Sequence, residues 1–172
     1  KDFTHVSLVA QNFGQVLVVP ATSKATTFKE LIDEAVRSPG KLNYAHAGLG
    51  TASHIPAELM KTMTGTDILP VPYKGVAEAT NDVIAGRVDL FFVGTQIAQQ
   101  HVQAGTLRAL AITGARRWKG MPQVPTLNEL GLTADGYALV TMHRDHNTDV
   151  PERLNAIIGA LIELHDTHQL PL

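Results

Sequence analysis

Between Leu42 and Thr113 the chain alternates short apolar runs with amphipathic segments, and this alternation restricts the fold more than any other feature. Each apolar run has the length of a strand, and each amphipathic segment has the spacing of a helix with one buried face. A glycine closes each helical segment, at the position where left-handed backbone geometry commonly ends a helix. This rhythm is typical of a parallel α/β sheet with right-handed crossovers. The predicted strands are 42–45, 68–71, 88–93 and 107–113, and the predicted helices between them are 54–63, 76–85 and 96–104.

Two further strands and a helix are predicted before this region. The apolar runs 6–10 and 16–19 are separated by a polar, glycine-containing loop. The apolar residues of 28–36 recur with helical spacing, and a Ser-Pro-Gly sequence then stops the helix. Thr27 is placed to cap the start of this helix, with Glu30 completing a capping box.

The regular alternation ends after Thr113. Basic residues and two prolines in 116–125 indicate a connecting segment. Beyond it the pattern predicts a short helix at 126–130, a strand at 137–141 and a helix at 151–164.

Composition narrows the classes of function. The chain has 172 residues, 44% of them hydrophobic, and a formal net charge of −2. It has no Lys/Arg stripe of the kind that binds nucleic acid, and its apolar runs are far shorter than a membrane span, so we expect a soluble domain. Cysteine is absent, which removes disulfides, thiolate catalysis and cysteine-based metal sites.

Three turns lie where a ligand is expected. In open parallel sheets, ligands bind beyond the carboxyl ends of the strands, where helix N-termini converge. The turns 45–53, 72–75 and 93–95 occupy that position. The first turn holds two glycines and the hydroxyls of Thr51 and Ser53, and the helix behind it offers free N–H groups and a positive dipole end. Such a site suits a carboxylate or a phosphate.

Plainer interpretations of these turns stay open at this point. The glycines can serve only as tight turns between strand and helix, and the pattern is neither a Rossmann fingerprint nor a P-loop. Lys74 can pair with an anion or simply be solvated. Pro56 predicts that the helix begins near Ser53, because proline is tolerated only in the first turn.

Catalytic and metal-binding alternatives have weak support. The chain contains no Gly-x-Ser-x-Gly elbow, no His-Glu-x-x-His sequence and no Asp-x-Asp calcium loop. His54 and Glu58 are one helical turn apart, but two ligands without a third favour a structural role. The polar cluster of His143, Asp145, His146 and Asp149 is interpreted as an exposed loop or packing contact, and His101 and His165 as packed or boundary residues.

The motifs together resemble a known family. A Val-Pro-Tyr-Lys-Gly sequence at 71–75 is the most specific of them, and the chain matches in order from about residue 2 to residue 136. The chain resembles the substrate-binding proteins of tripartite tricarboxylate transporters, also called Bug or TctC-like proteins. The other matching segments are 42–45, 54–59, 84–92, 101–111 and 121–126.

The resemblance implies a two-lobed periplasmic binding fold of type II, in which a mostly parallel sheet is flanked by helices. A small organic anion, often a dicarboxylate, is held between lobes that close around it. One carboxyl group meets backbone N–H groups and hydroxyls of the loop that matches 47–54, and the turns matching 73–75 and 94–95 face the cleft. The expected ligand-binding residues are Ala47, Gly48, Gly50, Thr51, Ser53, His54, Tyr73, Lys74, Gly75, Gly94 and Thr95.

Departures from the family pattern suggest a fragment. The Pro-x-x-Pro-Gly-Gly loop of the first lobe is absent from this chain, and the sequence drifts from the family after Tyr137. We therefore expect 1–20 to be crossover strands from the first lobe, 21–115 the second, ligand-binding lobe, and 116–172 a connecting segment with a partial return. The family is monomeric, and exposure of the surface meant for the first lobe favours dimerisation of this chain.

The expected function is capture of a mono- or dicarboxylate for the membrane components of a tripartite tricarboxylate-type transporter, without catalysis or cofactor and without nucleic acid as a partner. The resemblance implies a periplasmic location, although no signal peptide opens this chain. One alternative is the effector-binding domain of a transcription regulator, which requires a helix-turn-helix upstream. Another is a small α/β enzyme acting on a carboxylate, for which the chain offers only histidines.

Overall fold

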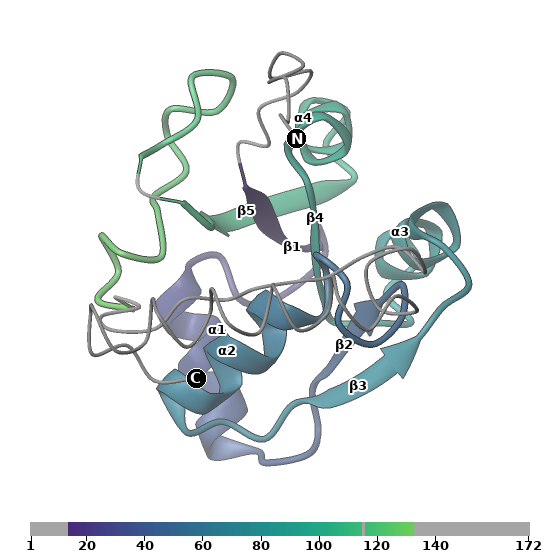
Figure 1. The fold of residues 1–172 in the computed structure, drawn as a ribbon, viewed down its shortest axis with the longest axis vertical. Coiled ribbons are helices and arrows are strands. Elements are labelled where there is room, and N and C mark those ends of the chain that lie inside the picture. The colour runs from purple at the N-terminus through teal and green to yellow at the C-terminus, as the bar shows by residue number, and fades with distance from the viewer. Residues whose placement is uncertain (1–13, 115, 133–172) are drawn as a thin grey trace, which may run out of the picture. The chain divides into compact units, whose positions relative to one another are not determined.

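A computed structural model describes residues 14–114 and 116–132, and within them five strands form one sheet (Figure 1). The strand order is β3-β2-β4-β1-β5. The strands are β1 (Gln15–Pro20), β2 (Asn43–His46), β3 (Leu69–Pro72), β4 (Leu90–Gly94) and β5 (Leu107–Ile112). All five positions were predicted to within a few residues.

The sheet is mixed, because β1 runs against its neighbours. β2 pairs in parallel with both β3 and β4, whereas β1 is antiparallel to β4 and to β5, so β5 runs in the same direction as β4. The prediction of a mostly parallel sheet flanked by helices is therefore confirmed, and β1 is the strand that runs antiparallel to its neighbours. Apolar runs specify a buried strand but not its direction, and β1 is fully buried between two neighbours.

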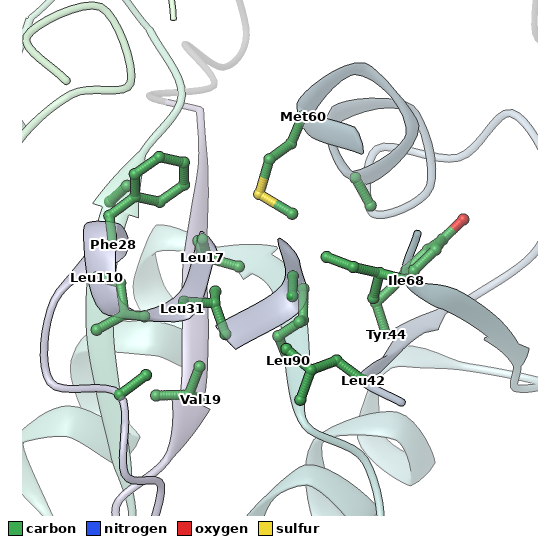
Figure 2. Packing of buried hydrophobic residues seen from close by; sticks show 14 of the residues in the cluster. Leu17, Val19, Phe28, Leu31, Leu42, Tyr44, Met60, Ile68, Leu90 and Leu110 are labelled. Atoms are coloured by element: carbon green, nitrogen blue, oxygen red, sulfur yellow. The ribbon is translucent and has the colours of Figure 1, made fainter. Parts of the chain in front are cut away.

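Helices cover both faces of the sheet. The helices α1 (Phe28–Arg37) and α2 (Ile55–Thr64) bury side chains such as Leu31 and Met60 against one face. Figure 2 shows Leu17 and Val19 of β1 in this cluster. The helices α3 (Val76–Ile84) and α4 (Thr95–Gln103) pack on the other face, against the alternate residues of the same strand. The result is three layers with an apolar core on each side of the sheet.

The chain leaves β2 and β4 toward opposite faces. After β2 it enters α2, and after β4 it enters α4, although these two strands are neighbours. This arrangement is a topological switch point, where ligands of open α/β sheets bind. The pairing of β2 with β4 ends at Ala45 and Phe91, before the last residues of β4. The two strands therefore separate toward their carboxyl ends.

Helix ends follow the local signals in the sequence. Thr27 and Glu30 form the predicted capping box at the start of α1, with the Thr27 hydroxyl accepting from the Glu30 N–H at 3.2 Å. Gly65 ends α2 with a left-handed φ of 64°, and Gly86 and Gly105 also have positive φ. These local predictions are confirmed.

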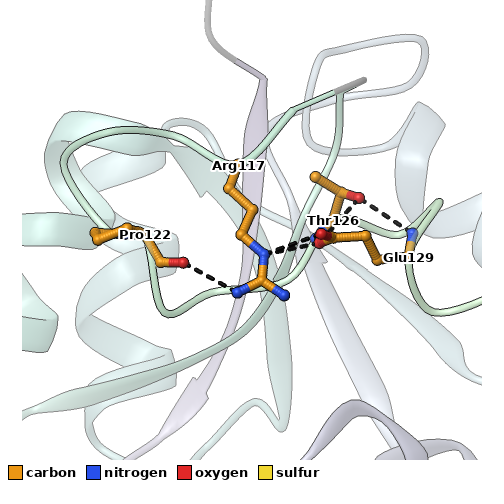
Figure 3. Close-up of polar contacts among 4 residues, drawn as sticks. All are labelled: Arg117, Pro122, Thr126 and Glu129. Carbon is orange, nitrogen blue, oxygen red and sulfur yellow. Dashed lines mark hydrogen bonds and ion pairs between the residues drawn. The ribbon is translucent and has the colours of Figure 1, made fainter.

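The segment after β5 forms turns. The helix predicted at 126–130 is wrong, because these residues form only a single hydrogen-bonded turn, which ends at Gly131 with φ 86°. Thr126 and Glu129 bond reciprocally in this turn, and Arg117 donates to Glu129 and to the Pro122 carbonyl (Figure 3). Since residue 126 also bridges to β5, the turn is held against the sheet.

Several predictions lie outside the described residues. These are the strands at 6–10 and 137–141, the helix at 151–164, and the polar residues His143, Asp145, His146 and Asp149. The division into lobes at residues 20 and 115 stays a prediction. Among the described residues, no helix is both long and apolar enough to cross a membrane.

The cap of α1 allows a direct test of this local structure. Thr27→Ala removes the hydroxyl that accepts from the Glu30 N–H, so we expect the free energy of unfolding to fall by about 1 kcal/mol. Thr22→Ala is the matched control, because Thr22 is exposed and its hydroxyl has no hydrogen bond within the described part of the chain. Urea unfolding of both variants measures the difference, and equal stabilities would argue against the cap.

Candidate functional site

The starts of three helices meet at one edge of the sheet. Because β2, β3 and β4 are parallel, their carboxyl ends share an edge, and α2, α3 and α4 begin there. The N-cap residues are His54, Gly75 and Gly94, and none of them makes a side-chain capping bond. By contrast α1, which follows the antiparallel β1 at the opposite edge, has a complete capping box. This edge therefore keeps uncapped helix N-termini, which favour an anion.

The two hydroxyl groups of the loop 47–54 form hydrogen bonds within the loop. The Ala47 N–H donates to Ser53 Oγ at 3.1 Å, Ser53 Oγ lies 3.0 Å from Thr51 Oγ1, and Thr51 Oγ1 donates to the Gly48 carbonyl at 2.7 Å. Since Thr51 gives its only proton to that carbonyl, Ser53 must be the donor to Thr51. Both hydroxyl protons, which we expected to meet a ligand, are thus committed within the loop.

Free donors in this loop are backbone groups. Gly48 N–H donates to His46 Nδ1 at 3.2 Å, and Gly50 N–H lies 3.4 Å from His54 Nδ1. The N–H groups of residues 49, 51, 52 and 53 have no acceptor within the described structure. Three of these four are consecutive, and together they provide donors for an oxyanion.

Glycines at this edge serve two different purposes. Gly48 and Gly50 have φ of 123° and 70°, which L side chains rarely adopt, so the turn itself requires them. Gly75 has an extended φ of −170° and Gly94 a φ of −57°, both open to other residues. A Cβ added at Gly75 or Gly94 would meet no atom within 4 Å. The fold of the described residues therefore gives no reason for glycine at these two positions.

A polar cluster fixes α2 against β2. Tyr44, which is fully buried, donates to Glu58 Oε1 at 2.6 Å, and Lys61 Nζ donates to the same oxygen at 2.7 Å. Burial works against ionisation of Glu58, but the bonds from Lys61 and Tyr44 outweigh it and lower the pKa of this carboxyl. Burial and the Glu58 carboxylate raise the pKa of Tyr44. The cluster sets the position of the start of α2 relative to the sheet.

Two histidines lie beneath the same loop. The rings of His46 and His54 approach edge to face, with centroids 4.9 Å apart. Burial and the nearby His46 lower the pKa of His54, so its imidazole is neutral at pH 7 and can accept from Gly50. His54 and Glu58 both have structural partners, since Glu58 Oε1 accepts from Tyr44 and Lys61 and His54 Nδ1 lies 3.4 Å from the Gly50 N–H. No group of three or more metal-ligating side chains was found among the residues described.

The other predicted site residues with side chains differ in their exposure and in their hydrogen-bond partners. Tyr73 directs its hydroxyl to Asp82 of α3 at 2.9 Å, a structural use of that group. Lys74 is exposed and forms no ion pair in the part of the chain that the structure describes. Thr95, the first residue of α4, is only 8% exposed, and its hydroxyl has no hydrogen-bond partner in the described ranges.

Three contributors to this edge were not among the predicted site residues. Leu49 and Ala52 supply two of the free N–H groups, and His46 supplies a buried imidazole at the end of β2. A polar residue at the end of an apolar strand, directly before a glycine-containing loop, is the signal that could have identified His46.

The hydrogen bonds within the loop predict that removing the Ser53 hydroxyl lowers the free energy of unfolding. Ser53 is 5% exposed, and Ser53→Ala leaves the Ala47 N–H without an acceptor, so we expect a loss of about 1–2 kcal/mol in unfolding free energy. Thr62→Ala is the control, since Thr62 is an exposed α2 residue whose hydroxyl bonds only to the Glu58 carbonyl. If chemical denaturation gives the two variants the same stability, the inferred hydrogen-bond chain is wrong.

Comparison with known proteins supplies a family for this architecture. A family model described as the tripartite tricarboxylate transporter family receptor, TctC, matches residues 1–161. The curated UPF0065 protein in the tcbD-tcbE intergenic region of Pseudomonas sp. strain P51 is 36% identical over 170 residues. That alignment covers 96% of this chain and 50% of the relative, so the chain spans half the length of the relative.

Two solved structures have the same fold over most of the described residues. R. palustris Rpa4515 with adipate matches with a TM-score of 0.68 and 36% identity, over 71% of this chain and 41% of that chain. MatC (Rpa3494) from Rhodopseudomonas palustris with bound malate matches with a TM-score of 0.66 and 26% identity, over 70% and 41%. These likenesses and the family match confirm what the sequence motifs indicated: the chain belongs to the tripartite tricarboxylate transporter receptor family.

Proposed function

We propose that this chain is the ligand-binding lobe of an extracytoplasmic receptor that captures a small organic carboxylate for a tripartite tricarboxylate-type transporter. The observation that carries the proposal is the edge where α2, α3 and α4 begin without side-chain caps, at the switch point between β2 and β4. Its free N–H groups and dipole ends favour a carboxylate without a lysine or arginine.

The presence of glycine at the starts of α3 and α4 supports the proposal that a ligand binds at this edge. Gly75 and Gly94 start α3 and α4, and neither the backbone geometry nor the packing of the described residues requires glycine there. The absence of a side chain lets an anion approach the first N–H groups of both helices. Thr95 adds a buried hydroxyl without a partner in the described structure, which a carboxylate oxygen would satisfy.

The ligands of related proteins point to the chemical class. The two similar R. palustris proteins hold adipate and malate, which are both dicarboxylates. In this chain one carboxyl group would bind at the 49–53 loop and the starts of α3 and α4. The second carboxyl group would meet residues of the first lobe, since the chain spans half the length of its relative.

The proposed role is capture and release, without chemistry on the ligand. Closure of two lobes around the anion would exclude water and strengthen each hydrogen bond to it. Membership of a receptor family supports this role over an enzyme or a regulator. The transporter's membrane components would then accept the ligand in the periplasm.

Calorimetric titration with adipate and malate tests the proposal. Gly75→Ala and Gly94→Ala should each weaken binding roughly tenfold or more, because a methyl group in space used by the ligand costs about 1–3 kcal/mol. Neither variant should lose stability, since Gly→Ala at a compatible φ tends to raise unfolding free energy by about 0.4–1 kcal/mol.

Ala85→Ser is the matched control, because it adds one atom at the far end of α3, where Ala85 is exposed. It should bind both acids like the unsubstituted chain. Stable glycine variants with unchanged affinity would remove this edge as the ligand site. Failure of the unsubstituted chain to bind either acid would count against the proposal as a whole.

A further inference from the structure

A buried histidine at this edge has one ring nitrogen without a partner in the described part of the chain. His46 is the last residue of β2 and is only 3% exposed. Its backbone carbonyl accepts from the Tyr73 N–H at 2.9 Å, which fixes the strand end against β3. Its ring lies beneath the loop 47–54, in contact with the ring of His54.

Hydrogen bonding determines which nitrogen carries the proton. Nδ1 of His46 accepts from the Gly48 N–H at 3.2 Å, so in the neutral ring the proton is on Nε2. This Nε2–H has no acceptor among residues 14–114 and 116–132. Buried donors in native proteins nearly always have a partner, because leaving one unsatisfied is unfavourable. The missing acceptor is therefore a feature that a ligand oxygen would explain.

The position of His46 in the fold agrees with this explanation. The pairing of β2 with β4 stops at Ala45. His46 is therefore the first residue of β2 beyond its pairing with β4, although it still pairs with Pro72 of β3. The residue ends β2 at the switch point between β2 and β4, directly before the loop with the free N–H groups, and its ring also lies near that of Tyr44, with centroids 5.8 Å apart.

We infer that His46 is a ligand-binding residue, and that its Nε2–H donates a hydrogen bond to an oxygen of the carboxylate bound at this edge. The inference rests on the proposed function and adds an imidazole donor to a site proposed to consist of backbone N–H groups and the Thr95 hydroxyl. A neutral N–H donor selects for an acceptor oxygen at one fixed position. His46 would therefore discriminate between acids that place an oxygen there and acids that do not.

A pair of substitutions separates ligand binding from a role in holding the loop. His46→Asn keeps an oxygen near the Nδ1 position, where it can accept from the Gly48 N–H, but it lacks the distal donor. His46→Gln places an N–H near the Nε2 position and lacks the proximal acceptor. Adipate and malate titrations measure the affinity of each variant.

If His46 binds the ligand, His46→Asn weakens binding of the tighter acid about tenfold or more, and His46→Gln stays within about threefold of the unsubstituted chain. The inference is overturned if His46→Asn binds normally or if both variants lose affinity equally. In either of those cases, binding by the unsubstituted chain still supports the proposed function. Absence of binding by that chain overturns both.

A second measurement avoids any effect of substitution on folding. In the ¹⁵N-labelled unsubstituted chain, side-chain NMR follows the Nε2 resonance of His46 as adipate is added. A shift of Nε2 that saturates together with the calorimetric binding curve supports the contact. Backbone shifts at the loop with an unmoved Nε2 resonance would overturn the inference and leave the carboxylate site in place.

Discussion

Parallel pairing of β2 with both β3 and β4 is the constraint on which the candidate site depends. It brings the starts of α2, α3 and α4 to one edge and sends the chain to opposite faces after β2 and β4. Capping differs between the two edges. The helix α1, at the opposite edge, has a capping box, whereas the three helices at this edge have no side-chain cap. The donors that a capping side chain would otherwise occupy stay available to an anion.

The loop between β2 and α2 combines rigidity with available donors. The hydroxyls of Thr51 and Ser53 bond within the loop, and a hydrogen bond from the buried Tyr44 to Glu58 holds α2 against β2. The loop therefore keeps its shape without a ligand, which reduces the ordering cost of binding. In the proposed site, recognition falls to backbone N–H groups, the Thr95 hydroxyl and, by our inference, His46. Neutral donors of this kind suit the reversible binding that the proposed receptor role requires.

Local features of the fold could be predicted from the sequence, and long-range ones could not. Periodicity located the strands and helices, and Thr27, Glu30 and Gly65 marked helix ends, because capping depends on residues close in sequence. The antiparallel direction of β1 depends on its pairing with strands that are distant in sequence. An apolar run does not specify which strands it will pair with. The loop was identified as a site from its glycines and from the family motifs. The hydrogen bonds of its hydroxyls, and the lack of an acceptor for His46 Nε2 among the described residues, depend on three-dimensional contacts that no motif records.

The central claim is that a carboxylate binds where these helices begin. A titration of the ¹⁵N-labelled chain with adipate, followed through backbone amide resonances, tests it most directly. If the carboxylate binds there, the amides of 49–53 and of the first residues of α3 and α4 shift together along one binding curve. Shifts confined to the opposite edge, at 21–25 and the start of β5, would contradict it, as would unchanged spectra at millimolar adipate.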